Sequence, residues 1–576
     1  MYSIFSSWLF YFMAAHLAIL IFLCVKNFKF IHQSVKKIDK KIWLLLILIF
    51  VFSFSLRNSE YWLGPFSDGY VAQESARMWV LNGDYVKSCA LGTPADCKIP
   101  EQVLFPAGFP FLIALAHLIF GIHSLNASVI SAILSSLTTI IVFLVTFFIS
   151  KKENAGLYAA LIFSFIPLNI VYSQTGETRP TGLFFEGLAI LLFLVAVKNN
   201  RIINWLAVAA SVSYAIYVRQ ESYILVPIFL IFFVIFKWKE IKNIVKNTVN
   251  KYIDEKKMFF DPQIAKTIFI FLLFFVLQIP VLKWLIFNNP YESYQGGGFF
   301  ALHYKGIMIQ GKAIFLQFFN AVPNSLVWTN IFHYNIASSI LLLVAVAVFI
   351  LNPRKKNIFI LSILVGYYIV YSLMFDGNIQ GTGKLTGDYF RRATMFHISY
   401  AVISGIGFCF ISPFKKKIYV IVNLLILFFI LLFSNYSYFQ VRYVKETPVS
   451  FYFPMKIFQD SRATKSGDRS IIYPDSSYWH IVSKLPPNCL VVMGMYLVAT
   501  NDYFKDFNFK AVSIDMINYA RKDIFLKEFE ENQCIIYLSD YRCMRSDRAC
   551  QFLDDHLTRN FLFQEGDIKA FSAQLK

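Results

Sequence analysis

Residues 66–85, FSDGYVAQESARMWVLNGDY, follow closely on the apolar run 42–56 (IWLLLILIFVFSFSL) and are polar, acidic at their start and helical in pattern. Ionisable groups beside a bilayer are costly and usually pair with each other or face a cavity, so Asp68 is a candidate functional residue. The alternative is that Asp68 serves only as the helix N-cap. Glu74 and Arg77 lie three apart on the same helix and are predicted to form a local ion pair.

The composition is that of an integral membrane protein. Of the 576 residues, 57% are hydrophobic and only 15% charged, and the mean hydropathy is +0.54. The net charge of +19 comes from basic clusters between apolar runs, where a membrane protein keeps its cytoplasmic charge, which argues against nucleic acid as a partner. The first run, 8–25, lacks a basic leader and a small-residue cleavage site, so it is predicted to be a retained helix.

About twelve apolar runs are long enough to cross roughly 30 Å of hydrocarbon. They lie at residues 8–25, 42–56, 127–149, 155–172, 182–197, 203–218, 223–236, 267–287, 336–351, 358–375, 394–411 and 418–433. The predicted fold is therefore an all-α polytopic membrane domain over residues 1–434. The shorter run 109–120, with prolines at its start, is predicted to be an interfacial helix.

The connections between the runs sort into two kinds. Those rich in lysine and arginine lie at 26–41, 151–152, 198–201, 237–266, 354–356 and 415–417, and the positive-inside rule assigns them to the cytoplasm. The outer connections then collect most of the remaining ionisable residues: Asp68, Glu74, Arg77, Glu177, Arg179, Arg219, Glu221, Asp376, Asp388, Arg391 and Arg392. This pattern predicts one outward-facing polar site. The alternative is that each residue is an interfacial anchor, or that Glu177 only neutralises Arg179.

The tail, residues 435–576, lacks membrane-length apolar runs and alternates helix and strand patterns. We predict a small extracytoplasmic α/β domain, built on an open sheet with parallel strands. No glycine-rich phosphate loop follows any of its strands, so nucleotide binding has no support.

Six of the eight cysteines lie on the predicted outer side, where disulfides form. Two local pairs are predicted to be bonded, Cys89 with Cys97 and Cys543 with Cys550. Cys489 and Cys534 each begin a predicted strand, and either pair or are simply buried. Zinc is the competing reading, but the spacing does not match a structural zinc site.

Four features of the outer segments resemble the GT-C class of membrane glycosyltransferases, in particular the branch of protein O-mannosyltransferases and bacterial aminoarabinose transferases. The first is the juxtamembrane helix with Asp68, Glu74, Arg77, Gly83, Asp84 and Tyr85 in register. It lies in the predicted outer loop 57–126. The others are FPAGFPFLIALAHLIFG (105–121), YSQTGETRPTGLFF (172–185) and GDYFRRATMF (387–396).

The resemblance implies an inverting enzyme that moves a sugar from a polyprenyl phosphate to a lipid, glycan or protein acceptor outside the plasma membrane. Asp68 is the candidate base, and Glu177 a candidate to share its task because Gly69 stands at the family's second acidic position. Arginines suit the leaving phosphate; the candidates are Arg391 or Arg392, then Arg179 and Arg219. Glu74, Arg77 and Glu221 are expected to support them. Dependence on a divalent metal stays open.

Two other classes of membrane protein share some of these features. An oligosaccharyltransferase-like protein would carry a WWD-type acceptor motif in its tail, and the tail has none. A secondary transporter would show internal repeats and ionisable residues near the bilayer midplane. We find no repetition between the two halves, and the ionisable residues are expected at the outer helix ends.

Overall fold

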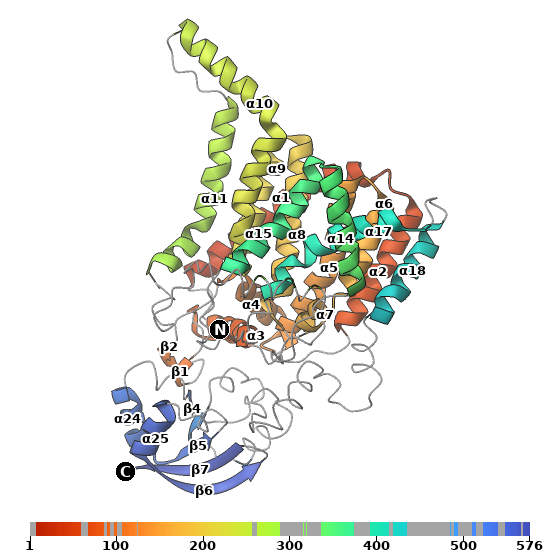
Figure 1. Ribbon diagram of the computed structural model, residues 1–576. Helices are drawn as coiled ribbons and strands as arrows, with labels where there is room; N and C mark the ends of the chain where they lie inside the picture. Colours follow the sequence, from red (N-terminus) through yellow and green to blue (C-terminus); the bar gives the residue numbers. More distant parts are fainter. Residues whose placement is uncertain are drawn as a thin grey trace.

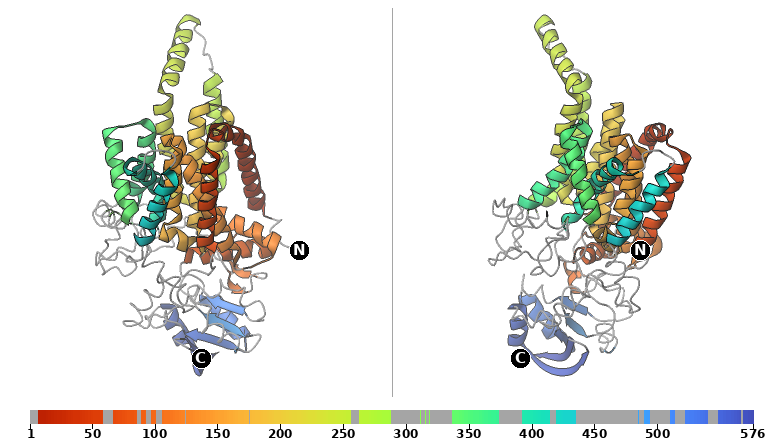
Figure 2. Two further views of the ribbon diagram at one scale, coloured as in Figure 1. Left: turned by 90° about the vertical axis from the view of Figure 1, so that its right-hand side faces the viewer. Right: turned by 45° about the vertical axis from the view of Figure 1, so that its right-hand side comes forward.

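The computed structural model is a bundle of helices with a β-sheet at one end (Figure 1). Figure 2 shows the sheet at the end of the bundle opposite to the C-terminal part of α10. The structure describes residues 7–58, 67–85, 89–92, 97–100, 106–123, 125–174, 176–255, 262–287, 311, 315, 318, 336–373, 392–413, 419–434, 484, 489–493, 510–513, 522–539, 548–565 and 568–576.

A helix, or two consecutive helices, coincides with each predicted apolar run. They are α1 (Trp8–Val35), α2 (Lys40–Asn58), α5 (Leu125–Ser150), α6 (Glu153–Ser164), α7 (Pro167–Gln174), α8 (Thr178–Asn199), α9 (Ile202–Val218), η2 (Gln220–Ile224) with α10 (Leu225–Glu255), α11 (Pro262–Phe287), α14 (Ile336–Leu351), α15 (Lys355–Leu373), η5 (Arg392–Phe396) with α17 (His397–Ile411), and α18 (Val420–Ser434). Among the described residues, five helices are long and apolar enough to span a membrane, or six if the pair α6–α7 counts as one span. The number of about twelve spans stays a prediction.

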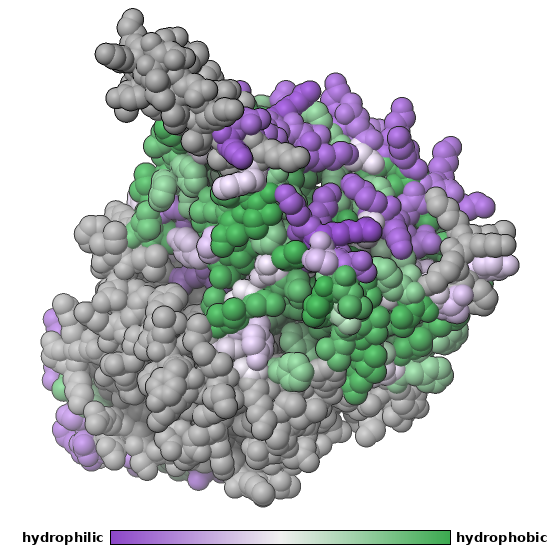
Figure 3. All heavy atoms as spheres, turned by 45° about the horizontal axis from the view of Figure 1, so that its top comes forward, coloured by the Kyte–Doolittle hydropathy of each residue, from purple (hydrophilic) through white to green (hydrophobic). Residues whose placement is uncertain are grey.

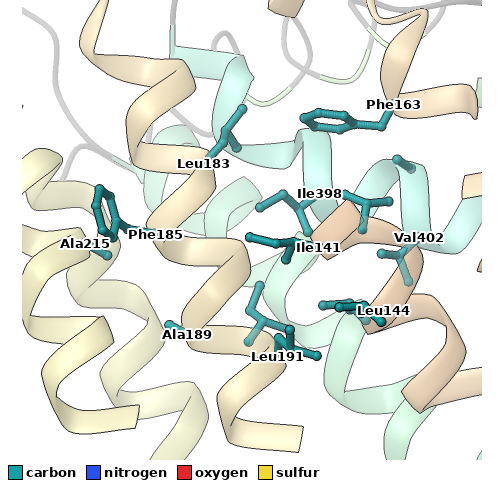
Figure 4. Packing of buried hydrophobic residues seen from close by; sticks show 14 of the residues in the cluster. Ile141, Leu144, Phe163, Leu183, Phe185, Ala189, Leu191, Ala215, Ile398 and Val402 are labelled. Carbon is teal, nitrogen blue, oxygen red and sulfur yellow. The ribbon is translucent and has the colours of Figure 1, made fainter. Parts of the chain in front are cut away.

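Helix α8 is the centre of the bundle and packs on α5, α9 and α17. Figure 4 shows Leu183, Phe185 and Leu191 of this helix among the buried side chains of its neighbours. At Gly187 a Cβ would lie 3.0 Å from Ile141 and 3.2 Å from Ile398, so glycine allows the helices to approach closely. Small residues commonly have this role where membrane helices meet.

The predicted run 155–172 is broken: α6 and α7 meet at an angle of 65°. Pro167 begins α7, because proline fits the first position of a helix but not its interior. The break leaves carbonyl groups at the end of α6 without intrahelical donors. Arg57, at the end of α2, donates to two of them, with 3.3 Å to Phe163 O and 3.4 Å to Ser164 O.

The helix of the opening segment is α3 (Ser67–Asn82), and the short apolar helix is α4 (Gly108–Phe120). Gly83 ends α3 with φ +85° and donates to Trp79 O, the left-handed ending that glycine favours. The residues from Ala72 to Val80 are buried, including Trp79 at 0% exposure. This helix is therefore enclosed by protein: α3 packs against α4, and Trp79 against Phe10 of α1.

The part of the sheet formed by described residues has seven strands in the order β2-β1-β4-β3-β5-β7-β6. The strands are β1 (Cys89–Gly92), β2 (Cys97–Pro100), β3 (Leu490–Met493), β4 (Lys510–Ser513), β5 (Ile535–Ser539), β6 (Leu557–Glu565) and β7 (Ile568–Leu575), with helices α24 (Lys522–Glu531) and α25 (Arg548–His556). Only β4, β3 and β5 run parallel, so the sheet is mixed rather than all parallel.

The hairpin β1–β2 belongs to the first predicted outer loop, yet it completes the sheet of the tail. Leu91 and Gly92 pair antiparallel with Val512 and Ala511 of β4. The loop that carries α3 and the tail therefore lie on the same side of the bundle (Figure 1).

A disulfide joins Cys489 and Cys534, whose Cα atoms are 4.8 Å apart. These residues immediately precede the parallel strands β3 and β5, so the bond closes the middle of the sheet. Of the two readings left open by the sequence, pairing is correct. Cys543 lies outside the described residues, as do the side chains of Cys89, Cys97 and Cys550, and their two disulfides stay predictions.

Candidate active site

The first part of the candidate site is the turn that begins α8. Gly176 has φ +67°, and a Cβ there would lie 2.9 Å from Ala127 Cβ, so glycine is needed both for the backbone and for space. The turn directs Glu177 and Arg179 towards each other: Arg179 Nη1 donates to Glu177 Oε2 at 2.7 Å. Both side chains are buried, and the guanidinium of Arg179 lies 5.2 Å from the ring of Tyr172.

The second part is Arg219, which follows α9. Its Nη1 donates to Thr178 Oγ1 at 3.2 Å, and its Nη2 is paired with Glu221. Gly182 makes room for this side chain, because a Cβ there would lie 2.7 Å from Arg219 Cγ and 3.8 Å from Met395 Cε. The structure thus brings Arg219 and η5 to the same end of α8 as Glu177.

Arg392 is the first residue of η5, and η5 packs against α8, α15 and α17. Its backbone is therefore close to the end of α8 that carries Arg179. Its side chain lies outside the described residues, as do Arg391, Asp376 and Asp388 entirely.

Asp68 is the second residue of α3, and α3 contacts α8. The Asp68 side chain is not among the described ones, so its place relative to the other candidates stays a prediction. The predicted ion pair within α3 is confirmed: Arg77 donates to both Glu74 oxygens, at 2.8 and 2.9 Å. Glu74 is 1% exposed and Arg77 8%, so this buried fork stabilises α3 from within the protein.

Residues missed by the sequence reading connect these parts. Gln174, the last residue of α7, donates its amide to Leu56 O at the end of α2 at 2.9 Å. With the bonds from Arg57 to α6, this ties the start of the loop with Asp68 to the turn with Glu177. The sequence does contain a signal for Arg57, because an arginine directly after the apolar run 42–56 is unusual and needs partners.

Glu186 is a second missed residue, and it corrects the expectation that ionisable residues lie only at outer helix ends. It is 1% exposed within α8, and its Oε1 accepts hydrogen bonds from Ser222 Oγ at 2.6 Å and Tyr367 OH at 2.7 Å. The sequence signal for Glu186 is a single carboxylate within the apolar segment FFEGLAILL (184–192). Its bonds join α8 to η2, which holds Glu221, and to α15.

The described side chains of this site supply acidic and basic groups. Within the described ranges, no group of three or more His, Cys, Asp or Glu residues could hold a metal ion. A carboxylate held near the membrane surface can accept a proton from an attacking group. Guanidinium groups and the N-terminus of α8 can stabilise an anionic leaving group, particularly a phosphate.

Residues 105–250 match the family model described as dolichyl-phosphate-mannose-protein mannosyltransferase. This segment holds α4, the Glu177 turn and Arg219. The fold is similar to that of ArnT from Cupriavidus metallidurans bound to undecaprenyl phosphate, with a TM-score of 0.50 and 12% identity over 93% of this chain and 98% of that chain. No curated protein sequence matches the chain.

Two further structures have lower scores. The apo state of the same ArnT has a TM-score of 0.48 at 12% identity, covering 92% of this chain and 97% of that chain. The Archaeoglobus fulgidus oligosaccharyltransferase in its apo form has a TM-score of 0.48 at 12% identity, covering 92% and 74%. The resemblance to GT-C membrane glycosyltransferases drawn from the sequence is confirmed by the family match and the ArnT fold. The prediction of a glycosyltransferase is confirmed with it.

Proposed function

We propose that this protein transfers a sugar from a polyprenyl phosphate to a lipid, glycan or protein acceptor on the outer face of the plasma membrane. The observation that carries the proposal is the meeting of the Glu177–Arg179 pair, Arg219, η5 and α3 at one end of α8. The matched family is named for a dolichyl-phosphate donor, and the ArnT structure contains undecaprenyl phosphate. Both names support a lipid phosphate as the donor here.

In the proposed reaction, an acceptor oxygen or nitrogen attacks the anomeric carbon as the bond from that carbon to the phosphate oxygen breaks. Asp68 takes the acceptor's proton, alone or with Glu177. The polyprenyl phosphate leaves with the bonding electron pair, and its charge is held by Arg391 or Arg392 together with Arg179 and Arg219. Attack opposite the leaving phosphate inverts the anomeric configuration.

The Cys489–Cys534 disulfide supports the outer location of the tail, because such bonds persist in oxidising compartments. The hairpin β1–β2 joins the loop that carries α3 to this same sheet. If the sugar of the lipid-phosphate donor lies outside the membrane, the candidate base Asp68 of α3 must lie on that side too. The pairing of β1 with the tail is consistent with this requirement.

The test uses membranes that contain the full chain and a labelled polyprenyl-phosphate sugar. Asp68→Asn is compared with the parent at equal expression, and Asp39→Asn is the matched control. Asp39 is an exposed residue at the start of α2, on the opposite side, where its Oδ1 accepts from Lys41 N. Asparagine can still accept that bond.

We expect Asp68→Asn to lose transfer by at least about 10²-fold, the usual contribution of a general base, and Asp39→Asn to keep it. Full transfer by Asp68→Asn would remove Asp68 from the mechanism. Uptake of sugar into sealed vesicles without covalent transfer would instead support a transporter and overturn the proposal.

A further inference from the structure

Three lysines from three separate segments converge on Phe148, near the end of α5. Lys356, at the start of α15, donates from Nζ to Phe148 O at 2.9 Å. The Nζ atoms of Lys151 and Lys198 lie 5.3 and 5.8 Å from the centre of the Phe148 ring. We call Lys151, Lys198 and Lys356 the lysine cluster.

The cluster lies at the end of α8 opposite to the candidate active site. Lys198 follows Arg179 by nineteen residues on this helix, a rise of about 28 Å at 1.5 Å per residue. That rise is close to the roughly 30 Å thickness of the hydrocarbon layer. The cluster is therefore at the level of the lipid headgroups of the opposite leaflet. Hydrophilic side chains gather at this end of the bundle (Figure 3).

The cluster brings like charges together in a partly buried place. The pKa of Lys356 is lowered to about 8, first by burial and then by the charges of Lys151 and Lys198. The pKa of Lys151 is also lowered, by burial and then by Lys198. Interaction with the end of α5, where helix carbonyls are exposed, favours cations but leaves their mutual repulsion in place. An anion between the amines would relieve that repulsion.

We propose that the lysine cluster binds the headgroup phosphate of an anionic phospholipid from the leaflet opposite to the candidate active site. Basic pockets between membrane helices bind such headgroups. Apolar surface for the acyl chains begins beside the neighbour of Lys151 in the sequence: Phe410, at the end of α17, is 43% exposed, and its ring centre lies 5.2 Å from Lys152 Nζ. A soluble anion would have no use for this surface.

The first experiment measures lipid binding to the purified full chain by native mass spectrometry, with short-chain phosphatidylglycerol and phosphatidylcholine as probes. The test variant is Lys151→Gln/Lys198→Gln/Lys356→Gln. The matched control is Lys26→Gln/Lys29→Gln/Lys41→Gln, which removes the same charge from exposed lysines elsewhere.

We expect the test variant to bind phosphatidylglycerol about a hundredfold more weakly than the parent, at roughly fivefold for each lysine lost. The control variant should lose only a small part of its affinity for phosphatidylglycerol. The affinity for phosphatidylcholine should be the same in the parent and both variants. Equal losses of phosphatidylglycerol affinity in both triple variants would mean that binding depends on the total positive charge and not on the lysine cluster. This result would overturn the proposal. If inorganic phosphate at the same concentration displaced the lipid completely, the lipid assignment would be wrong.

A second experiment distinguishes lipid binding from a purely structural role for Lys356. In detergent without anionic lipid, Lys356→Gln should raise the melting temperature, because it removes a repelled charge. Phosphatidylglycerol should then stabilise the parent and leave the variant nearly unchanged. A lower melting temperature of the variant both with and without the lipid would show that the lysine only caps α5.

Discussion

The guanidinium of Arg57 donates to the carbonyl oxygen of Phe163, 3.3 Å away, and so supplies a hydrogen bond that the break between α6 and α7 removes. Arg57 is 0% exposed and also donates to Ser135 Oγ at 2.8 Å and Ser53 Oγ at 2.7 Å. A broken helix is tolerated inside a membrane protein when neighbouring groups satisfy its backbone. Arg57 thus shares this role with the backbone, since Ile166 N also donates to Phe163 O, at 3.3 Å.

Arg57→Met should destabilise the protein by roughly 2–5 kcal/mol, because Ser164 O and two buried serine hydroxyls lose a charged donor, while Phe163 O keeps its bond from Ile166 N. Thermal unfolding in detergent measures the effect. Arg57→Lys should recover only part of the loss, since an ammonium lacks the planar fork. Ser55→Ala is the control, because this exposed hydroxyl donates within its own helix turn, to Val51 O; a similar loss of stability in this variant would contradict the explanation.

Glu177 and Arg179 should act as a unit. We expect Glu177→Gln and Arg179→Gln each to lower sugar transfer by about 10²-fold, and the double variant to be little worse than either. The measurement is the rate of sugar transfer from the labelled lipid donor by the parent, the two single variants and the double variant. Losses that simply multiply would show that the two residues work independently, despite their 2.7 Å contact.

Gly182→Ala should impair the site without removing any charged group. The added Cβ would lie 2.7 Å from Arg219 Cγ, so Arg219 must leave its bond with Thr178. We expect a higher KM for the lipid donor and about a tenfold loss of kcat/KM. Arg219→Ala combined with Gly182→Ala should be no worse than Arg219→Ala alone; a further loss would place the effect elsewhere.

The Cys489–Cys534 disulfide should contribute about 4 kcal/mol to the stability of the tail, as expected for a closed loop of 45 residues. Cys489→Ala should therefore make the tail sensitive to protease. Mass-tagging with a maleimide should label Cys534 in this variant but not in the unreduced parent. Labelling of Cys534 in the parent would show that the bond is absent. Cys24→Ala, which removes a free cysteine, is the control.

The stability difference between the parent and Lys356→Gln should depend on pH. The folded-state pKa of Lys356 is about 8, below its usual value of 10.5, and the charges that face it are Lys151 and Lys198. A lowered lysine pKa disfavours folding fully below about pH 8, and this penalty disappears as pH rises towards 10.5. Without anionic lipid, the melting temperature of the parent should therefore approach that of the variant between pH 8 and 10. If the difference in melting temperature stayed constant with pH, the positive charge of Lys356 would not be what destabilises the folded protein.

Local patterns predicted much of the helical part. Apolar runs indicated where helices lie, because length and hydropathy are properties of short segments. The Glu74–Arg77 pair followed from helical spacing alone. The break at Pro167 was missed, although the proline itself is a local signal.

Long-range relations could not be predicted in the same way. Nothing in residues 89–100 specifies pairing with Val512, since strand partners depend on which edge the folded tail presents. The hairpin β6–β7 was also missed, because Phe561, Leu562 and Phe563 are all apolar and show no strand-like alternation. The contacts of Arg57 and Glu186 depend on helix packing, which hydropathy does not encode.

The pairing of Leu91 with Val512 also constrains how the molecule is made. The two residues lie near opposite ends of the chain, so the edge of β1 stays open until nearly all of the protein has been synthesised. Sheets built from such distant strands form slowly, and exposed edges invite aggregation in the meantime. A nascent chain that stalls before β4 would contain the helices up to α18. The loop that carries α3 and the hairpin β1–β2 would not yet be paired with the tail.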